Sequence, residues 1–430
     1  MSPPSWGGAA HHILSISFTE LQLEPVIAAA HRRGAKITLA GSAQRFEQFA
    51  ATAAKADDRI IVDLRDGDPD ASLDLLVAAH RATPFAGLFV PADPEVLLAA
   101  RLAERIGVPW NRVEAVERIT SKWETRRALT AAGFRQPAHF LVSAEDDAGA
   151  IVAQGGAWIV KPARGTASEG VSKVTEPDQV EAAVENLRQF QPTGPFVVEQ
   201  CIAPMTEYSV EGVWFGGRPV VIGVTAKRTT GAPHFVETGH TVPVVLPSDL
   251  DAEVRDVVSR GLLALGASHG QFHVEVFVQP EQPPGARVIF GEGHVRAGGD
   301  RITQITALAG VDLDALAVDA IIGRAPETPP RPTAAAASRY LVFPRGRITS
   351  VVGLDEAASL PGVEHLSIDV GVGDVLEPVV GNGARHGRFV VVAESFDRAL
   401  ALADQVEQTI RVEVDPSPRQ GSVAVPSLTA

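Results

Sequence analysis

The sequence predicts an α/β and α+β fold that begins with a doubly wound parallel sheet and ends in a small α+β unit. Strand and helix patterns alternate through residues 12–107, which is typical of a parallel sheet with helices on both faces. Strand patterns joined by glycine or proline turns follow in the middle of the chain, with amphipathic helices between them, and glycine and proline turns punctuate residues 339–415. A length of 430 residues corresponds to roughly three domains.

Composition narrows the class of protein. The net charge is −14 and no basic run occurs, so we expect neither nucleic acid nor a membrane surface as a partner. The single cysteine, Cys201, excludes a disulfide framework and a thiolate metal cluster, and it is expected to be buried. No stretch reaches roughly 18 apolar residues and no targeting segment is recognised, so a cytoplasmic protein is expected.

The first region is assigned from its periodicity. Strands are predicted at residues 12–18, 35–41, 58–64 and 85–92, and helices at residues 23–34, 70–83 and 94–107. Two of these helices end at a glycine, which commonly terminates a helix. The first strand is not followed by G-x-G-x-x-G, so a dinucleotide site is not expected here.

A helix is predicted to start after Ser121 and to stop at Gly133. Ser121 and Glu124 form the S-x-x-E pattern of a capping box, which places Lys122 in the first turn. A lysine there opposes the helix dipole, so this position favours an anionic ligand over a purely structural surface lysine. Lysine is rare in this chain, and Lys122, Lys161 and Lys227 stand out for that reason.

Residues 158–171, WIVKPARGTASEGV, resemble a phosphate-binding loop. A short apolar strand ends at Lys161, and the segment then contains Gly165, Thr166, Ser168 and Gly170. Backbone N–H groups of such a loop can converge on phosphate oxygens, and the nearby ammonium adds positive charge. A plain strand–turn–strand is the alternative, because the pattern matches neither of the common phosphate-loop motifs.

Amphipathic helices and acidic strands follow this loop. Helices are predicted at residues 177–190 and 251–266, and strands at residues 196–202 and on both sides of Gly216–Gly217. The strands contain Glu199, Glu207 and Glu211, which are either functional or simply directed to solvent. Glu237 and His240 are expected in a loop.

A hairpin near residues 271–302 is the predicted chemical centre. The sequence QFHVEVFVQ alternates and carries Glu275, and the returning strand ends in Glu292, His294 and Arg296 before a glycine-rich bend. Two carboxylates on a hairpin suit a Mg²⁺ ion that bridges polyphosphate oxygens. The alternative is a pair of solvated strand acids, but so many glycines and charged groups in one bend favour a ligand site.

The order of these motifs resembles the ATP-grasp superfamily, and within it the carboxylate–amine ligases that join amino acids, the L-amino acid ligases or dipeptide synthases. The resemblance extends over most of the chain and includes the C-terminal phrases GRI…GL and VGD…P. It implies an N-terminal pre-ATP-grasp domain, a two-lobed ATP-grasp fold and a C-terminal cap, which the residues themselves predict to be a small α+β unit without a catalytic constellation. The corresponding ranges are 1–118, 119–202 and 203–325 for the first three parts, 326–338 for a linker, 339–415 for the cap and 416–430 for a disordered tail.

The resemblance also implies roles for individual residues. The ATP-binding set comprises Lys122, Lys161, Gly165, Thr166, Ser168, Gly170, Glu199, Gln200, Ile202 and Glu207. The Mg²⁺ set, for which Mn²⁺ is a substitute, comprises Glu275, Glu292 and His294. The substrate set comprises Glu237, His240, Arg296 and Gly299, with Arg296 and Lys161 also acting in catalysis.

One position departs from the family pattern. The usual E-x-N-x-R-x-G-G-D is E-G-H-V-R-A-G-G-D here, so His294 replaces an asparagine that helps to bind a second metal ion. Mg²⁺ prefers oxygen ligands, so His294 either binds metal, touches substrate or acts as a base. The number of metal ions is left open.

The implied reaction is ATP-dependent amide formation between a small carboxylate or amino acid and an amine, through an acyl phosphate. An Ala-, Gly-, Pro- and Arg-rich composition indicates a GC-rich genome, and such a ligase would suit a specialised peptide or antibiotic pathway. The resemblance further implies a homodimer. The alternatives are an ATP-grasp ligase or carboxylase of another branch, and a nucleotide-binding regulator that has lost the chemistry.

Overall fold

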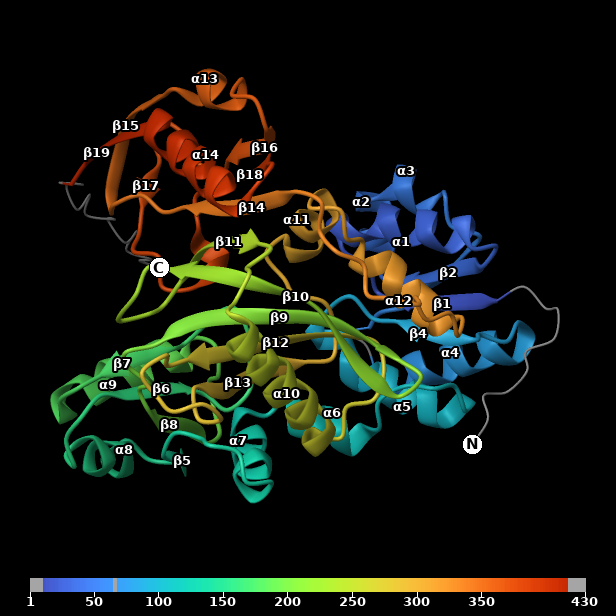
Figure 1. Cartoon of the computed structure of the whole chain (residues 1–430), viewed down its shortest axis with the longest axis horizontal. Coiled ribbons are helices and arrows are strands. Elements are labelled where there is room, and N and C mark those ends of the chain that lie inside the picture. The colour runs from blue at the N-terminus through green and yellow to red at the C-terminus, as the bar shows by residue number, and fades with distance from the viewer. Residues whose placement is uncertain (1–10, 65–67, 417–430) are drawn as a thin grey trace, which may run out of the picture.

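The computed structural model describes residues 11–64 and 68–416, and it begins with a parallel sheet of order β3-β2-β1-β4 (Figure 1). Its elements are β1 (His12–Ile16), α1 (Glu20–Arg32), β2 (Lys36–Gly41), α2 (Ala43–Gln48), α3 (Ala50–Ala53), β3 (Asp58–Ile61), α4 (Pro69–Ala82), β4 (Gly87–Phe89), η1 (Asp93–Glu95) and α5 (Val96–Ile106). Neighbouring strand residues pack on opposite faces: Ile13 joins the core under α1, whereas Leu14 joins the core under α4 and α5. The doubly wound prediction is confirmed, although α2 and α3 were not expected.

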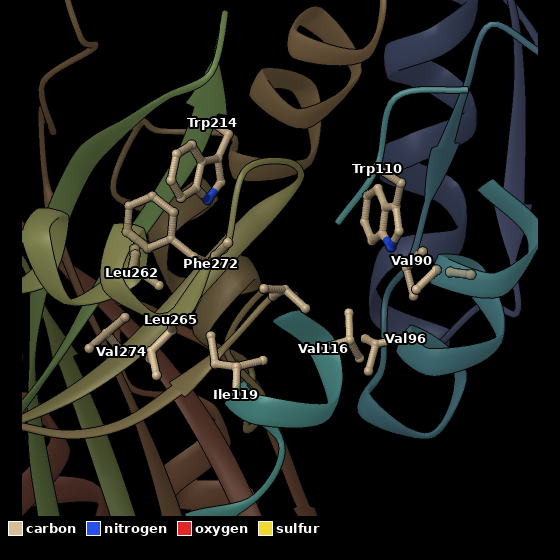
Figure 2. Close-up of a cluster of buried hydrophobic side chains, with 14 of the residues drawn as sticks. Val90, Val96, Trp110, Val116, Ile119, Trp214, Leu262, Leu265, Phe272 and Val274 are labelled. Carbon is tan, nitrogen blue, oxygen red and sulfur yellow. The ribbon is translucent and has the colours of Figure 1, made fainter. Parts of the chain in front are cut away.

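Two short helices join this domain to the next. They are α6 (Val113–Ile119) and α7 (Lys122–Ala131). The Ser121 hydroxyl accepts a hydrogen bond from the Glu124 amide, as the capping pattern predicts. Val116 and Ile119 of α6 lie between apolar side chains of the N-terminal domain and those of the central sheet, so one core connects the two regions (Figure 2).

The first lobe contains an antiparallel sheet of order β5-β8-β6-β7. Its elements are β5 (His139–Val142), α8 (Glu145–Val152), β6 (Trp158–Pro162), β7 (Ser172–Val174), η2 (Pro177–Gln179), α9 (Val180–Arg188) and β8 (Phe196–Gln200). Val180, Ala183, Val184 and Leu187 of α9 are buried against this sheet, so the predicted helical face is confirmed.

The second lobe belongs to an eight-stranded sheet of order β13-β12-β9-β10-β11-β14-β18-β16. It contributes β9 (Thr206–Phe215), β10 (Arg218–Thr229), β11 (Glu237–Val242), α10 (Ser248–Leu265), β12 (Gln271–Val278), β13 (Val288–His294), α11 (Ile302–Leu308) and α12 (Leu313–Ile321). The predicted hairpin is formed by β12 and β13, in which Glu275 lies directly opposite Glu292.

The C-terminal region adds further strands to that same sheet. Its elements are β14 (Ala335–Leu341), β15 (Gly346–Val352), α13 (Leu354–Ala358), β16 (Val363–Ile368), β17 (Val375–Leu376), η3 (Asn382–Ala384), β18 (Gly387–Ala393), α14 (Phe396–Thr409) and β19 (Arg411–Asp415). Strand β14 pairs with β11 on one side and β18 on the other, while β17, β15 and β19 form a separate small sheet.

The predicted linker 326–338 is therefore wrong over its last residues. Ala335, Ala336 and Ala337 are buried strand residues, because their small side chains allow helices to pack closely on both faces of β14. The predicted tail lies almost entirely outside the described residues. Within the described part of the chain, no helix combines the length and apolar character needed to cross a membrane.

Candidate active site

A cavity of about 630 Å³ collects residues from both lobes and from the C-terminal region. All but one of the residues predicted to form the site line this cavity. They are Lys122, Lys161, Gly165, Thr166, Ser168, Glu199, Gln200, Ile202, Glu207, Glu237, His240, Glu275, Glu292, His294, Arg296 and Gly299. Residues as far apart as 122 and 299 therefore share one chamber.

Gly170 is the exception. It does not line the cavity, and a Cβ atom at this position would lie 3.0 Å from both the Leu187 Cα and the Pro162 Cγ. Its φ of +70° is also in the left-handed region that favours glycine. Gly170 thus packs closely against α9 outside the cavity lining, and its part in ATP binding stays a prediction.

The loop after β6 has an unusual backbone. Gly165 has a φ of +126°, and Ala167 and Ser168 have φ values of +63° and +56°. Left-handed conformations cost free energy at residues other than glycine and cluster at ligand sites. Together with the lining of the cavity, this conformation fits a loop that presents its backbone to a ligand.

Lys161 and Glu199 form a buried ion pair with Arg126. The Lys161 Nζ atom lies 2.5 Å from Glu199 Oε1, and the Arg126 Nε atom donates to Glu199 Oε2 at 2.8 Å. Burial alone would raise the pKa of Glu199, but the two cations outweigh it and hold that pKa well below the usual range. Burial lowers the pKa of Lys161 despite the Glu199 charge. The carboxylate thus fixes one lysine at the end of β6.

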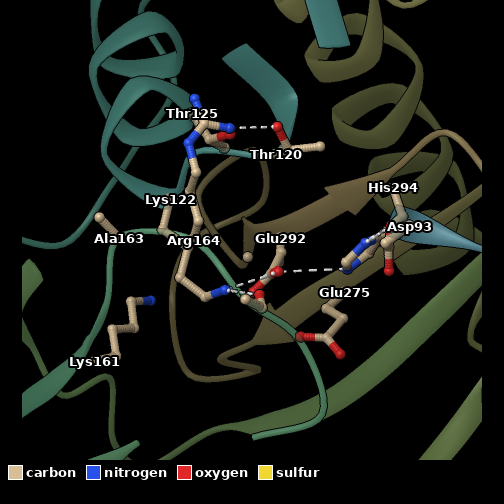
Figure 3. A network of polar contacts seen from close by, with 12 residues as sticks. Asp93, Thr120, Lys122, Thr125, Lys161, Ala163, Arg164, Glu275, Glu292 and His294 are labelled. Carbon is tan, nitrogen blue, oxygen red and sulfur yellow. Dashed lines mark hydrogen bonds and ion pairs between the residues drawn. The ribbon is translucent and has the colours of Figure 1, made fainter. Parts of the chain in front are cut away.

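A second chain of contacts runs from Lys122 through Glu292 and His294 to Asp93 (Figure 3). Lys122 donates to Glu292 at 3.1 Å and to the Gly165 carbonyl, and Glu292 lies 3.4 Å from His294 Nε2. On its other side His294 Nδ1 contacts Asp93 at 3.0 Å, and Asp93 also pairs with Arg296. The cationic partners hold the pKa of Asp93 far below normal against the effect of burial. The N-terminal domain therefore orients both His294 and Arg296.

Lys227 on β10 is surrounded by carboxylates from three neighbouring strands. Its Nζ atom lies 2.6 Å from Glu207, 2.7 Å from Glu237 and 2.5 Å from Glu275, and its side chain is 2% exposed. Burial would lower the pKa of Lys227, yet the carboxylates raise it well above its ordinary value. Burial raises the pKa of Glu207, whereas the Lys227 charge keeps the pKa of Glu237 low. One ammonium thus joins residues predicted to contact ribose, substrate and metal.

His273 supports this cluster from behind. Its Nδ1 atom lies 2.9 Å from Glu211 Oε1, and its Nε2 atom lies 3.9 Å from Glu275. Burial would lower the pKa of His273, but the Glu211 carboxylate outweighs that effect and the pKa is raised to about 9. Glu211 is therefore a buried acid paired with imidazole, and the solvent-facing alternative is wrong for it.

Glu237 and His240 lie in a strand, not in the predicted loop. They begin and continue β11, which is hydrogen-bonded to β10 and to β14. The His240 Nε2 atom lies 3.4 Å from Glu237 Oε2, and Asp300 brings a second carboxylate close to both. This segment is polar and shows no alternation of apolar residues, so its sequence did not predict a strand. It is a strand because its backbone pairs with β10 and β14.

The cavity fits Mg·ATP by its chemistry. Glu275 and Glu292 supply hard oxygen donors from paired strands, which together with phosphate oxygens and water is the set that Mg²⁺ prefers. His294 contacts Glu292 but does not complete a compact triad with the two glutamates among the described residues. Apolar side chains also line the cavity, namely Ile159, Val171, Ile202, Met205 and Phe277.

Several site residues were missed by the sequence analysis. Arg126 follows Lys122 by one helical turn and is fully buried, whereas the adjacent Arg127 is exposed and pairs with Glu124. Asp93 comes from the N-terminal domain. Its position just after the fourth parallel strand is the one sequence feature that could have indicated a site residue, because ligands bind at the carboxyl ends of such strands. Nothing local marks Asn382, which lines the cavity from the C-terminal region.

Family models match three successive segments of the chain. Residues 27–110 match the ATP-grasp N-terminal domain, residues 155–288 match the ATP-grasp domain, and residues 339–415 match the L-amino acid ligase C-terminal domain 2. The matched segments include the loop after β6, most of the second lobe and the C-terminal region that shares its sheet.

The chain aligns with most of one curated relative but with only a small part of another. The uncharacterized protein y4rH of Sinorhizobium fredii is 26% identical over 358 residues, which are 80% of this chain and 72% of that protein. Carnosine synthase 1 of Gallus gallus is 35% identical over 130 residues, which are 30% of this chain and only 13% of that protein.

Solved structures share the fold at low sequence identity. The L-amino acid ligase from Bacillus licheniformis superposes with a TM-score of 0.76 and 19% identity, covering 95% of this chain and all of that one. The biotin carboxylase domain dimer of Hydrogenobacter thermophilus 2-oxoglutarate carboxylase, in complex with MgADP, ADP and bicarbonate, gives a TM-score of 0.67 and 12% identity, covering 95% and 92%. The chain belongs to the ATP-grasp superfamily and carries a C-terminal domain of the L-amino acid ligase type.

Proposed function

We propose that the protein is an ATP-dependent carboxylate–amine ligase that forms an amide bond between a small carboxylate or amino acid and an amino acid or amine, releasing ADP and phosphate. One observation carries the proposal: the lysines of the phosphate end and the Glu237–His240 pair line the same cavity, with Glu275 and Glu292 between them. The match of residues 339–415 to an L-amino acid ligase domain supports this branch of the superfamily.

The nucleotide would lie between the two lobes. Lys122 and Lys161 would contact its phosphates, together with backbone N–H groups of the loop after β6. Glu199, Gln200 and Ile202 at the end of β8 would meet the base, although the buried pairing of Glu199 with Lys161 supports a positioning role for its carboxylate. Glu207 would accept hydrogen bonds from ribose hydroxyls.

The first half of the reaction is phosphoryl transfer. A carboxylate oxygen of the substrate forms a bond to the γ-phosphorus, the bond from that phosphorus to the bridging oxygen breaks, and ADP leaves. Lys161, the loop amides and Arg296 stabilise the charge that spreads over the transferring oxygens. Mg²⁺ or Mn²⁺ bound by Glu275 and Glu292 would supply further charge neutralisation.

Amide formation follows in the same chamber. The nitrogen of the second substrate, held beside Glu237 and His240, attacks the acyl carbon, phosphate leaves and the nitrogen loses a proton. Closure of the loop after β6 excludes water, which would otherwise hydrolyse the acyl phosphate. No side chain serves as a nucleophile in this scheme, consistent with a Cys201 thiol whose pKa burial raises.

Release of ADP and phosphate from Mg·ATP, measured against amino acids and small carboxylates offered singly and in pairs, tests the proposal. Mass spectrometry should detect a product at the summed mass of one pair less water, of the kind that specialised peptide or antibiotic pathways use. ATP binding without turnover on any pair would favour a nucleotide-binding regulator instead. Carboxylation of a substrate by bicarbonate would favour another branch.

We also propose that the chain forms a homodimer in solution. The support is the dimer of the Hydrogenobacter thermophilus biotin carboxylase domain, which shares the fold. Light scattering coupled to size-exclusion chromatography should give about twice the chain mass of 45.3 kDa, and a monomer at micromolar concentration would refute the dimer.

A further inference from the structure

The C-terminal domain, whose sequence shows no catalytic constellation, contributes a side chain to the cavity. Asn382 begins η3, is only 7% exposed and lines the cavity with the residues described above. It lies far along the chain from the loop and from β11, so its position depends on how the domain packs. Its contacts reach both ends of the site.

The Asn382 side chain binds the substrate end. Its Oδ1 atom accepts a hydrogen bond from the Glu237 amide at 3.0 Å, and its Nδ2 atom lies 3.4 Å from Asp300 Oδ2. Glu237 is the first residue of β11, and Asp300 follows the glycine-rich bend. Asn382 therefore fixes the start of the strand that presents Glu237 and His240 to the cavity.

The Asn382 backbone binds the phosphate end. Its N–H group donates to the Ala167 carbonyl at 3.1 Å, in the part of the loop with left-handed φ values. The Ser168 hydroxyl donates to the Phe235 carbonyl at 3.2 Å, two residues before β11. The same few residues thus connect the loop after β6 to the C-terminal domain and to the strand of the predicted substrate pair.

Arg385 secures this arrangement. Its two terminal nitrogens bind both carboxylate oxygens of Asp300 at 2.6 and 2.7 Å, and Nη1 also donates to the Glu237 carbonyl at 3.0 Å. The guanidinium stacks on the Tyr340 ring at 3.6 Å. A bidentate, stacked arginine holds its partners in a defined geometry, so Asn382 has little freedom to shift independently of β11.

We propose that Asn382 is a positioning residue through which the C-terminal domain couples occupancy of the substrate end to closure of the loop over the phosphates. The inference rests on the proposed ligase function. A substrate that orders Glu237 and Asp300 also orders Asn382, whose N–H group then holds Ala167. An empty or misplaced substrate end weakens the same hydrogen bond, so the acyl phosphate is formed under a closed loop only when both substrates are present.

The variant Asn382→Ala tests the coupling, because it keeps the backbone N–H group and removes the side-chain contacts. We expect the ratio of phosphate released to amide formed to rise several-fold. The KM for the amine should increase about tenfold, the size expected when a buried donor loses its acceptor. The affinity for ADP without substrate should stay within about twofold of wild type, since Lys122 and Lys161 are unchanged.

A second measurement does not need turnover. Arg164 lies exposed in the loop, so the rate of tryptic cleavage after it reports loop opening. With MgADP bound, cleavage should be several-fold faster in Asn382→Ala than in wild type. Arg388→Met is the matched control, because Arg388 lies in the same region, does not line the cavity and, among the described residues, forms its ion pair with Asp369 at 3.1 Å.

The outcomes separate the two proposals. This inference would be overturned, and the ligase function left standing, if Asn382→Ala kept three wild-type values: the ratio of phosphate to amide, the KM for the amine and the cleavage rate. Equal effects in Arg388→Met would also overturn it, because they would reflect general weakening of the domain. A wild-type protein that forms no amide with any pair would overturn the ligase function, and the cleavage rates would still decide whether Asn382 holds the loop.

Discussion

Lys161 and Glu199 face each other on adjacent strands β6 and β8, with 2.5 Å between Nζ and Oε1. Both side chains are almost fully buried, so the ammonium is held at the end of β6 by a carboxylate that is itself shared with Arg126. Lys161→Met should reduce kcat by about 100-fold or more, the range found when a preorganised charge at a transition state is removed. The melting temperature should change little, since Glu199 would still be paired with Arg126.

ADP release and the melting temperature check this result, with Lys55→Met as the control. Lys55 forms an exposed ion pair with Glu24, and such pairs contribute little to stability or to a distant site. Near-normal turnover in Lys161→Met with unchanged nucleotide affinity would contradict the assignment of Lys161.

Arg126 should matter first for stability. It binds Glu199 and also donates to the carbonyls of Phe290 and Gly291 at 2.8 and 2.9 Å. Arg126→Met leaves these acceptors buried and should lower the free energy of unfolding by about 3–5 kcal/mol. Urea unfolding measures the loss, and Arg127→Met, which removes an exposed neighbour, should be nearly neutral. If the two variants lowered the free energy of unfolding equally, the buried contacts of Arg126 would not be what stabilises the fold.

Gly170 and Gly165 should respond differently to alanine. A Cβ at Gly170 meets Leu187 and Pro162 at 3.0 Å, whereas a Cβ at Gly165 meets nothing within 4 Å. Both have positive φ, so each substitution costs about 1–2 kcal/mol of backbone strain, but Gly170→Ala adds overpacking. We expect the larger fall in melting temperature for Gly170→Ala and the larger loss of ATP affinity for Gly165→Ala. The reverse order would favour Gly170 as part of the nucleotide site.

The buried carboxyl group of Asp314, which does not line the cavity, should make the stability of the fold depend on pH. Its Oδ1 atom accepts hydrogen bonds from Gln22 at 2.8 Å and Gln271 at 3.0 Å, and burial raises its pKa to about 6. The folded pKa exceeds the unfolded one, so ionisation opposes folding. The penalty is absent below pH 4, grows between about pH 4 and 6 and is complete above pH 6.

Asp314→Asn keeps the accepting oxygen and removes the charge. The variant should be more stable than wild type at pH 7.5 by up to about 3 kcal/mol and equal to it near pH 4. Urea unfolding at both pH values gives the comparison. The same difference at the two pH values would mean that the carboxyl does not titrate in this range.

His294→Asn should show whether the departure from the family pattern affects metal use. His294 lies between Asp93 and Glu292, and asparagine offers an oxygen of the kind that Mg²⁺ prefers. We expect the Mg²⁺ concentration for half-maximal ADP release to fall several-fold, with Lys122 contacts unaffected. An unchanged Mg²⁺ dependence together with reduced kcat would favour a role toward substrate.

Periodicity predicted the helices and strands whose own sequence shows which of their side chains are buried. The N-terminal strands are apolar on both faces and alternate with amphipathic helices, and β12 of the Glu275–Glu292 hairpin alternates in polarity, so these strands were recognisable. The segment that starts at Glu237 is polar and contains glycine, and it is a strand only because β10 and β14 lie on either side. Its partners are distant in sequence, which no local pattern reveals.

In the candidate site, too, some residues could be predicted from the sequence and others depended on the tertiary fold. The family motifs pointed to residues that line one cavity, but their roles toward ligands stay predictions. Arg126 could not be distinguished from Arg127 in the sequence, because which face of a short helix is buried depends on the tertiary fold. Asn382 and Asp93 were missed because each reaches the site from another domain.

The continuous hydrogen bonding from β11 through β14 to β18 limits how this protein could be recombined with its relatives. A graft that joined a foreign C-terminal domain at residue 339 would cut through the middle of β14 and would separate Asn382 from the loop it binds. The tolerable crossover lies between Ile321, where α12 ends, and Ala335, where β14 begins. Even there, the incoming domain must bring residues that fit Ala167 and Glu237, so exchange of this domain would alter the catalytic chamber itself.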